Sequence, residues 1–462
     1  MKHLMISLAL FMLAAGADAR TYNEQIAEAM NTANWFALDS IYRNAPKDSI
    51  MPFLEVFSRC LIGNRLNRPD VSMPAFEELF KTQSDLLNLD NLLNSAIMYS
   101  MDLSRTGANG QAARMLETVF ASTRGYIDSV WTDAMQKNIS RYKVLSAYKP
   151  YSITFAGSLG RVPFQLMPIG NSKYESVLMH LKEGSINGID ADITFDTGAA
   201  ANIISDSLAS KYNLIELDAT NTVKGMGKRE GRYAIAKELK IGNITMSDVP
   251  FIIVSLTTGN VEADQHIGAF SIVVGLELML QLKDLTIDFT KHEITIPAIA
   301  PTRSATPPNL CFSSEMNLLA KGSILGDSIL MLIDTGNASA GYIGHRFFSD
   351  YQNYITTHAK IDTIRGAGLG GYRISECYNL SDVYIGLGGN TLSSPGIVVV
   401  MADDNSECDC NIGIKTLMRF DRLRLNLIDF TITTEPHREA TVSPQIVKTK
   451  PLPNKYGDIG AN

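Results

Sequence analysis

The second half of this chain repeats the first, and this repeat constrains the fold more than any other feature of the sequence. Short segments recur in the same order, displaced by 138 residues at three places and by 141 residues at two others. Surface loops tolerate insertions, so a small change of offset is expected within a duplicated unit. The sequence therefore predicts two lobes of similar fold. The matched segments are residues 184–188 (GSING) with 322–326 (GSILG), 195–199 (FDTGA) with 333–337 (IDTGN), 225–227 (GMG) with 366–368 (GAG), 273–275 (VVG) with 411–413 (NIG), and 285–289 (LTIDF) with 426–430 (NLIDF).

Hydrophobic periodicity divides the chain further. Apolar residues at three- and four-residue spacing indicate helices before residue 148, with a weak resemblance to tetratricopeptide-like helix pairs. Short alternating runs separated by Gly, Asn and Asp indicate strands after it. A chain of 462 residues is also too long for one core. We expect a signal peptide at 1–19, a helical region at 20–148, a first lobe at 149–300, a linker at 301–309, a second lobe at 310–435 and a flexible tail at 436–462.

The first residues have the pattern of an export signal. A positive end at Lys2 and His3 precedes an apolar run, and Ala17-Asp18-Ala19 fits a small-x-small cleavage site. The alternative is a buried N-terminal helix. The apolar run is too short to span a bilayer, and no later stretch is long and apolar enough to do so, so we expect no integral membrane segment. We predict an exported protein, periplasmic or secreted to the outside of a bacterial cell.

Charge and cysteine content exclude several classes of function. A formal net charge of −7 offers no basic field for a phosphate backbone, so no nucleic acid partner is expected. Five cysteines are too few for a disulfide framework. The cluster Glu407-Cys408-Asp409-Cys410 suggests either a metal or redox site or core cysteines, and the repeat favours the core, with a disulfide from Cys377 left open. No histidine has metal-ligand spacing, so we expect no metal and no cofactor.

The duplicated Asp-Thr-Gly motif is the candidate catalytic feature. Each copy follows an apolar strand, and each is followed by a glycine-rich hairpin and an apolar-apolar-Gly strand. One copy alone is equally consistent with a simple turn. Residues 174–435 resemble the retropepsin-like aspartic peptidases of the pepsin and retropepsin clan. The resemblance implies a multidomain chain with a mainly β, bilobal aspartic-protease fold of two pseudo-symmetric lobes, preceded by an all-α region.

The resemblance assigns Asp196 and Asp334 as a catalytic dyad. Two adjacent carboxylates share one proton because close like charges do not both ionise, so the pair supplies a base that activates water and an acid that protonates the leaving nitrogen. The resemblance also implies supporting residues around the dyad. Gly198 and Gly336 would allow close approach of the two backbones, and the paired threonines would bond across the junction. The implied supporting residues are Thr197, Gly198, Thr335, Gly336 and Asn337.

Two glycine-rich hairpins are the candidate flaps over the substrate, although an ordinary hairpin turn is the alternative. Their residues are Gly225, Met226 and Gly227 in the first lobe and Gly366, Ala367 and Gly368 in the second.

The chain departs from the pepsin pattern three residues after each aspartate, where that pattern has Ser or Thr. Ala199 offers no side-chain donor to Asp196, and Asn337 offers one to Asp334 only if its amide points that way. A donor favours the charged carboxylate and lowers its pKa. Because this chain has fewer such donors than the pepsin pattern, the dyad should keep its shared proton to a higher pH than in pepsin-like enzymes. We therefore expect cleavage to peak in mildly acidic conditions.

The predicted function is that of an aspartic-type endopeptidase, a hydrolase carrying out proteolysis of extended polypeptides. The alternative is a non-catalytic peptide-binding scaffold in the cell envelope, and a third hypothesis is a narrow processing enzyme whose helical region docks one partner. We expect a monomer that binds a polypeptide substrate, with the helical region as a candidate surface for a protein partner.

Overall fold

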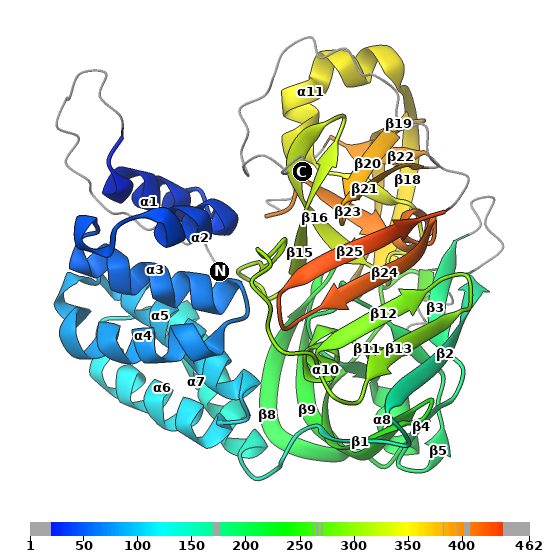
Figure 1. Cartoon of the computed structure of the whole chain (residues 1–462). Coiled ribbons are helices and arrows are strands. Elements are labelled where there is room, and N and C mark those ends of the chain that lie inside the picture. Colours follow the sequence, from blue (N-terminus) through cyan, green and yellow to red (C-terminus); the bar gives the residue numbers. More distant parts are fainter. Residues whose placement is uncertain are drawn as a thin grey trace. The chain divides into compact units, whose positions relative to one another are not determined.

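The computed structural model describes residues 20–169, 176–261, 263, 264, 268, 271–381, 383–394, 396–401 and 407–437. The predicted signal peptide and nearly all of the predicted tail lie outside these residues. The chain divides into two compact units, with the division between Ala147 and Tyr148. In Figure 1 the first unit is coloured blue to cyan and the second green to red. No helix in the described part of the chain is long and apolar enough to cross a membrane.

The first unit is all-α, as the hydrophobic periodicity predicts. Side-chain caps fix where several helices begin: Thr21 forms a capping box with Glu24, and Asn34, Asn88 and Asp128 each accept a backbone N–H from three residues further on. The α-helices are α1 (Tyr22–Asn31), α2 (Trp35–Asn44), α3 (Pro52–Arg65), α4 (Pro69–Thr82), α5 (Leu89–Arg105), α6 (Asn109–Thr123) and α7 (Ser129–Leu145), with short 3₁₀ turns η1 (Lys47–Ser49) and η2 (Ser84–Leu86).

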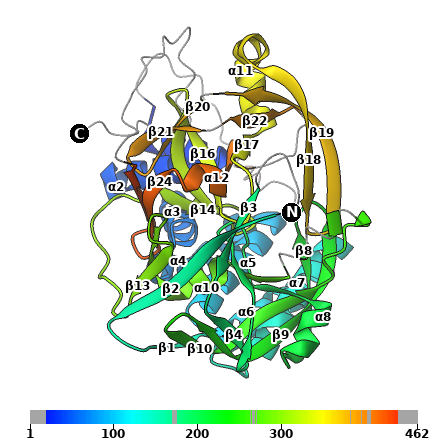
Figure 2. The same ribbon diagram turned by 90° about the vertical axis from the view of Figure 1, so that its right-hand side faces the viewer.

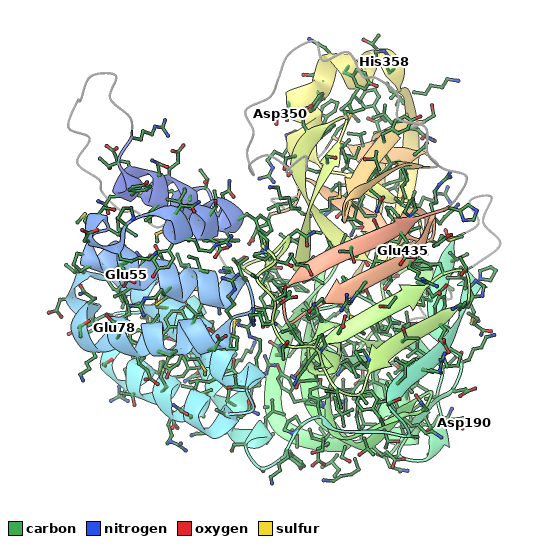
Figure 3. All side chains as sticks on the ribbon, viewed as in Figure 1. Glu55, Glu78, Asp190, Asp350, His358 and Glu435 are labelled. Atoms are coloured by element: carbon green, nitrogen blue, oxygen red, sulfur yellow. The ribbon has the colours of Figure 1, made fainter. Side chains whose placement is uncertain are left out.

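Consecutive helices of this unit pack against each other. At the crossing of α3 and α4, a β-carbon built on Gly63 would lie 2.4 Å from the backbone nitrogen of Ser72, so only glycine permits this approach. On the outer side of the same pair, Arg59 binds both Glu55 and Glu78 at 2.8 Å, and Figure 3 labels the two glutamates on α3 and α4. The helical unit thus has its own core.

The second unit consists of two β-rich lobes. Between Pro297 and Leu310 the chain forms no helix or strand, and this stretch contains the predicted linker. The first lobe contains β1 (Ser152–Phe155), β2 (Leu159–Pro168), β3 (Val177–Leu181), β4 (Gly184–Ile186), β5 (Ile189–Asp190), β6 (Ile193–Phe195), β7 (Ile203–Ser205), α8 (Asp206–Lys211), β8 (Ile215–Lys224), β9 (Lys228–Ile241), β10 (Ile244–Val254), β11 (Ile272–Val274), α10 (Leu276–Leu282), β12 (Asp284–Asp288) and β13 (Glu293–Pro297). The second contains β14 (Leu310–Phe312), β15 (Leu318–Ile324), β16 (Asp327–Asp334), β17 (Gly341–Ile343), α11 (His345–His358), β18 (Lys360–Gly368), β19 (Gly371–Leu380), β20 (Val383–Leu387), β21 (Asn390–Ser394), β22 (Ile397–Val400), β23 (Cys410–Gly413), α12 (Ile414–Leu417), β24 (Phe420–Asn426) and β25 (Thr431–Pro436).

Strand pairing confirms that the repeat in the sequence is a repeat in the fold. In the first lobe β11 lies between β6, to which it is parallel, and β7, to which it is antiparallel. In the second lobe β23 lies in the same way between β16 and β17. The register is also conserved, because Val273 pairs with Thr194, and the positions 138 residues later, Asn411 and Leu332, pair with each other.

A shared sheet joins the two lobes. β24 of the second lobe pairs antiparallel with β12 of the first, with Leu285 opposite Leu425, and β25 and β13 extend the sheet on either side. Across this pairing Arg424 donates two hydrogen bonds to the carboxylate of Asp284, at 2.9 and 2.8 Å. In Figure 1 the red and light-green strands of this sheet lie side by side. The lobes are therefore held together on one side by backbone pairing and ion pairs.

Candidate active site

The two aspartates stand at the ends of equivalent buried strands. β6 ends at Phe195, and β16 ends at Asp334 itself. The backbone N–H of Asp196 donates to Val274 O on the parallel strand β11 at 3.0 Å, and Asp334 is in register with Gly413 on β23. Because each strand is buried among apolar neighbours, it holds its aspartate in a fixed position.

The threonines that follow the aspartates bond across the lobe junction. The backbone N–H of Thr197 donates to the hydroxyl of Thr335 at 3.0 Å, and the N–H of Thr335 donates to the hydroxyl of Thr197 at 3.1 Å. Each hydroxyl in turn donates to the other lobe, Thr197 to Ile333 O at 2.7 Å and Thr335 to Phe195 O at 2.8 Å. Both threonines are buried, so these four bonds fix the two aspartate loops relative to each other.

The glycines of the two motifs each face the carboxyl group of the other lobe. A β-carbon built on Gly198 would lie 2.4 Å from Oδ1 of Asp334, and one built on Gly336 would lie 2.3 Å from Cγ of Asp196. No side chain fits at such distances. The glycines therefore permit the two carboxyl groups to approach each other.

The two carboxyl groups contact each other and receive different donors. Asp196 accepts the backbone N–H groups of Gly198 and Ala199 on Oδ1, at 2.8 and 3.2 Å. Asp334 accepts the backbone N–H of Asn337 on Oδ1 at 2.9 Å and the side-chain amide of Asn411 on Oδ2 at 2.6 Å. The two carboxyl groups lie close enough for each to shift the pKa of the other.

Desolvation acts on both aspartates, although each keeps part of its surface accessible. Desolvation and then the charge of Asp334 raise the pKa of Asp196. Desolvation also raises the pKa of Asp334, but the hydrogen bonds from Asn411 and Asn337 oppose this rise. The two carboxyl groups therefore titrate as a coupled pair.

The side-chain amide of Asn337 does not point to Asp334, and a residue of the site was missed. The side-chain amide of Asn337 donates to Oδ1 of Asn411 at 2.9 Å and not to Asp334, which Asn337 reaches through its backbone N–H. Asn411 is the side-chain donor to Asp334. The sequence signal for Asn411 was the repeat itself. It aligns Asn411 with Val273, so that an amide stands where the first lobe has an apolar residue in a buried strand.

The first candidate flap lies where the sequence places it. Gly225, Met226 and Gly227 form the turn between β8 and β9. The second is displaced, because its turn consists of Leu369 and Gly370.

The predicted residues Gly366, Ala367 and Gly368 lie at the end of strand β18 instead, where Gly366 pairs with Arg373. The β18–β19 hairpin is longer than the repeat offset suggests, so its turn comes later in the chain.

The two turns contact each other. The backbone N–H of Gly227 donates to Leu369 O at 3.1 Å, and a β-carbon built on Gly227 would lie 2.3 Å from Gly370 O. Figure 2 shows the β18–β19 hairpin reaching β8 along one side of the unit. A hydrogen bond between the turns thus closes a bridge from one lobe to the other.

The cysteines and potential metal ligands are placed as follows. All five cysteines are free and buried, so the disulfide left open for Cys377 is not formed. Within the described residues, no group of three or more His, Cys, Asp or Glu side chains is arranged to hold a metal ion.

Comparison with known proteins locates one recognisable region. Residues 183–270 match the family model described as aspartyl protease, and this range contains the first Asp-Thr-Gly motif and the first flap. Among solved structures, a retropepsin-like aspartic protease from Rickettsia conorii is matched with 13% identity over 31% of this chain and 96% of that chain, with a TM-score of 0.20. No curated protein is matched. The family match shows that residues 183–270 are similar to aspartyl proteases and supports a protease.

Proposed function

We propose that this chain is an aspartic endopeptidase in which Asp196 and Asp334 activate one water molecule for peptide-bond hydrolysis. The observation that carries the proposal is the reciprocal bonding of Thr197 and Thr335, which fixes two carboxyl groups in contact with each other. A structural turn needs no such symmetry across two lobes.

The chemistry follows from the shared proton. The ionised carboxylate takes a proton from water as the water oxygen attacks the scissile carbonyl carbon, and the protonated carboxyl donates to the carbonyl oxygen. Collapse of the tetrahedral species breaks the carbon–nitrogen bond while the nitrogen receives a proton. No covalent enzyme intermediate and no cofactor are needed.

The proposed substrate is an extended polypeptide. The flap hairpins are long, with β8 paired to β9 in the first lobe and β18 paired to β19 in the second. An extended peptide in contact with these strands would gain main-chain hydrogen bonds along its length, which gives affinity without strict sequence selection.

Substitution of each aspartate tests the proposal. The purified protein would be incubated with a peptide library, and products would be identified by mass spectrometry. We expect Asp196→Asn and Asp334→Asn each to abolish cleavage while the purified variants remain folded. Asp190→Asn, a surface aspartate in the same lobe as Asp196, is the matched control and should cleave normally. Cleavage retained by either dyad variant would exclude the mechanism.

A wild-type protein that cleaves nothing but binds library peptides would support the non-catalytic scaffold instead. A statine-type transition-state mimic separates the two functions further, because its hydroxyl occupies the position of the attacking water and it should inhibit only a working dyad.

Export and a partner-binding role of the helical unit are also part of the proposal. The N-terminal sequence pattern supports export, and the separate core of the helical unit supports an independent docking role. We expect mature protein in the periplasmic or culture fraction, acting as a monomer. Deletion of residues 20–147 should impair cleavage of a large partner more than cleavage of a short peptide.

A further inference from the structure

A line of hydrogen bonds in the second lobe leads to one oxygen of the dyad. The backbone N–H of Ser339 and its hydroxyl both donate to Oδ1 of Asn337, at 3.1 and 2.7 Å. The amide of Asn337 donates to Oδ1 of Asn411 at 2.9 Å, and the amide of Asn411 donates to Oδ2 of Asp334 at 2.6 Å. Every bond in this line therefore donates toward the carboxylate.

The direction of the line is fixed at its outer end. A backbone N–H can only donate, so the Ser339 N–H requires the oxygen of the Asn337 amide to face it. The nitrogen of Asn337 must then face Asn411, which turns the Asn411 oxygen toward Asn337 and its nitrogen toward Asp334. A donor that cannot reverse stabilises the ionised form of the carboxyl that it contacts.

The first lobe lacks this line at every position. The residues 138 positions before Asn337, Ser339 and Asn411 are apolar, and none carries a side-chain donor or acceptor. Among the described residues, the hydrogen-bond donors to Asp196 are accordingly backbone N–H groups. The fold is repeated, but the hydrogen bonds to the two carboxyl groups are not. The three first-lobe counterparts are Ala199, Ala201 and Val273.

We propose that Asn411, oriented by Asn337 and Ser339, holds Asp334 as the ionised member of the dyad, so that Asp196 carries the shared proton. This assignment rests on the proposed function. Asn411 contacts the reacting carboxyl, whereas Asn337 and Ser339 are positioning residues that act through it.

The assignment gives each proton a definite route. Asp334 takes the proton of the attacking water, and Asp196 donates its proton to the carbonyl oxygen of the substrate. When the carbon–nitrogen bond breaks, the nitrogen takes the proton from Asp334, and the re-forming carbonyl returns a proton to Asp196. One water is consumed, and both carboxyl groups regain their starting states.

Asp196 is the titratable group that interacts with Asp334. Asp409, which lies just before the strand that carries Asn411, is paired with Arg346. Lys415, in α12, is tied to the 337–341 loop by its backbone N–H on Ser339 O at 3.1 Å.

The pH dependence of kcat/KM for a fluorogenic peptide tests the assignment. Asn411→Val introduces the residue type found at the equivalent first-lobe position, Val273. Because this change removes the donor to Asp334, the acidic limb of the kcat/KM profile should shift to higher pH by about one unit. Asn337→Ala should shift the acidic limb in the same direction by less. Because Asn337 is partly exposed, this variant should fold and can test the assignment if Asn411→Val does not fold. Asn309→Ala removes a second-lobe amide bonded to the backbone of Ile432 and should leave the limb unmoved. An unmoved or lowered limb in folded Asn337→Ala and Asn411→Val would overturn the assignment.

A second measurement does not depend on activity. Asp196→Asn leaves Asp334 as the titrating member of the pair, so melting temperatures of Asp196→Asn with and without Asn411→Val report on Asp334 alone. The loss of Asn411 should cost more stability at neutral pH, where Asp334 is ionised, than at pH 3. A protein without peptidase activity would refute the proposed function while this difference still holds. A difference that does not vary with pH would refute the role of Asn411 even in an active peptidase.

Discussion

Thr197 and Thr335 exchange backbone-to-hydroxyl hydrogen bonds at 3.0 and 3.1 Å across the lobe junction, and each threonine hydroxyl also donates to a carbonyl group of the opposite lobe. The two aspartates are therefore positioned by bonds between the repeats, in addition to the strand on which each one stands. Disruption of either threonine should affect both lobes.

Thr197→Val should reduce both stability and activity. The change keeps the shape of the side chain but leaves the buried Ile333 O and Thr335 N–H without a partner, and each such group costs about 1–3 kcal/mol. Misplacement of the aspartate loops should lower kcat/KM by about 100-fold. Thr197→Ser retains the hydroxyl and is the matched control. Calorimetry and peptide cleavage would check the pair, and equal loss in both variants would contradict the role of the hydroxyl.

Gly336→Ala should abolish cleavage. The added methyl group would lie 2.3 Å from the carboxyl carbon of Asp196, so the two carboxyl groups would be forced apart. Overpacking of this kind costs about 1–3 kcal/mol, which a domain of this size tolerates. The variant should therefore fold and be inactive. Gly125→Ala, with no atom within 4 Å of the new methyl group, is the control and should leave melting temperature and activity as they are.

The duplicated motif and its strands could be predicted from the sequence because both depend on local patterns that repeat. The repeat shows Asn411 as an amide at an apolar position, but its bond to Asp334 could not be predicted, since the pattern gives no information on where that amide points. The position of the second flap turn could not be predicted from the sequence either. It depends on how far β18 and β19 remain paired, and the three residues Gly366, Ala367 and Gly368 are as compatible with a strand end as with a turn. Pairing of β12 with β24 is likewise a long-range contact that local periodicity does not encode.

Gly227→Ala should weaken substrate binding. The new methyl group would lie 2.3 Å from Gly370 O, which breaks the contact between the two flap turns. In the proposed function, flap closure would hold the substrate over the dyad, so the main effect should be a rise in KM of about 10-fold with a smaller change in kcat. Gly188→Ala, at a turn remote from the flaps, controls for loss of a turn glycine and should change stability alone. A fall in kcat at constant KM would argue against a role in closure.

Asp288→Asn should destabilise the protein at neutral pH. Desolvation raises the pKa of Asp288, but hydrogen bonds from Thr290 and Arg422 outweigh it and lower this pKa to about 2. A lowered pKa gives stability that is present above the unfolded-state pKa of about 3.9 and is lost as the pH falls through the folded value. The variant should melt several degrees below the wild type at pH 7, and the two curves should converge toward pH 2. Melting curves across this range would check the prediction, and a constant gap would contradict it.

Asp196→Asn should have the opposite pH dependence. Desolvation and the neighbouring Asp334 raise the pKa of Asp196, so the folded protein keeps a proton that the unfolded chain releases above about pH 3.9. The protonated carboxyl of Asp196 therefore contributes fully to the stability of the folded protein below that pH. This contribution is lost as the pH rises toward the pKa that Asp196 has in the folded protein. Asparagine resembles the protonated carboxyl and does not titrate, so the variant should melt at a higher temperature than the wild type at pH 7 and at nearly the same temperature at pH 3. Differential scanning calorimetry at both pH values measures this directly. A variant that melts below the wild type at pH 7 would show that the carboxyl of Asp196 is ionised there and stabilised by its surroundings.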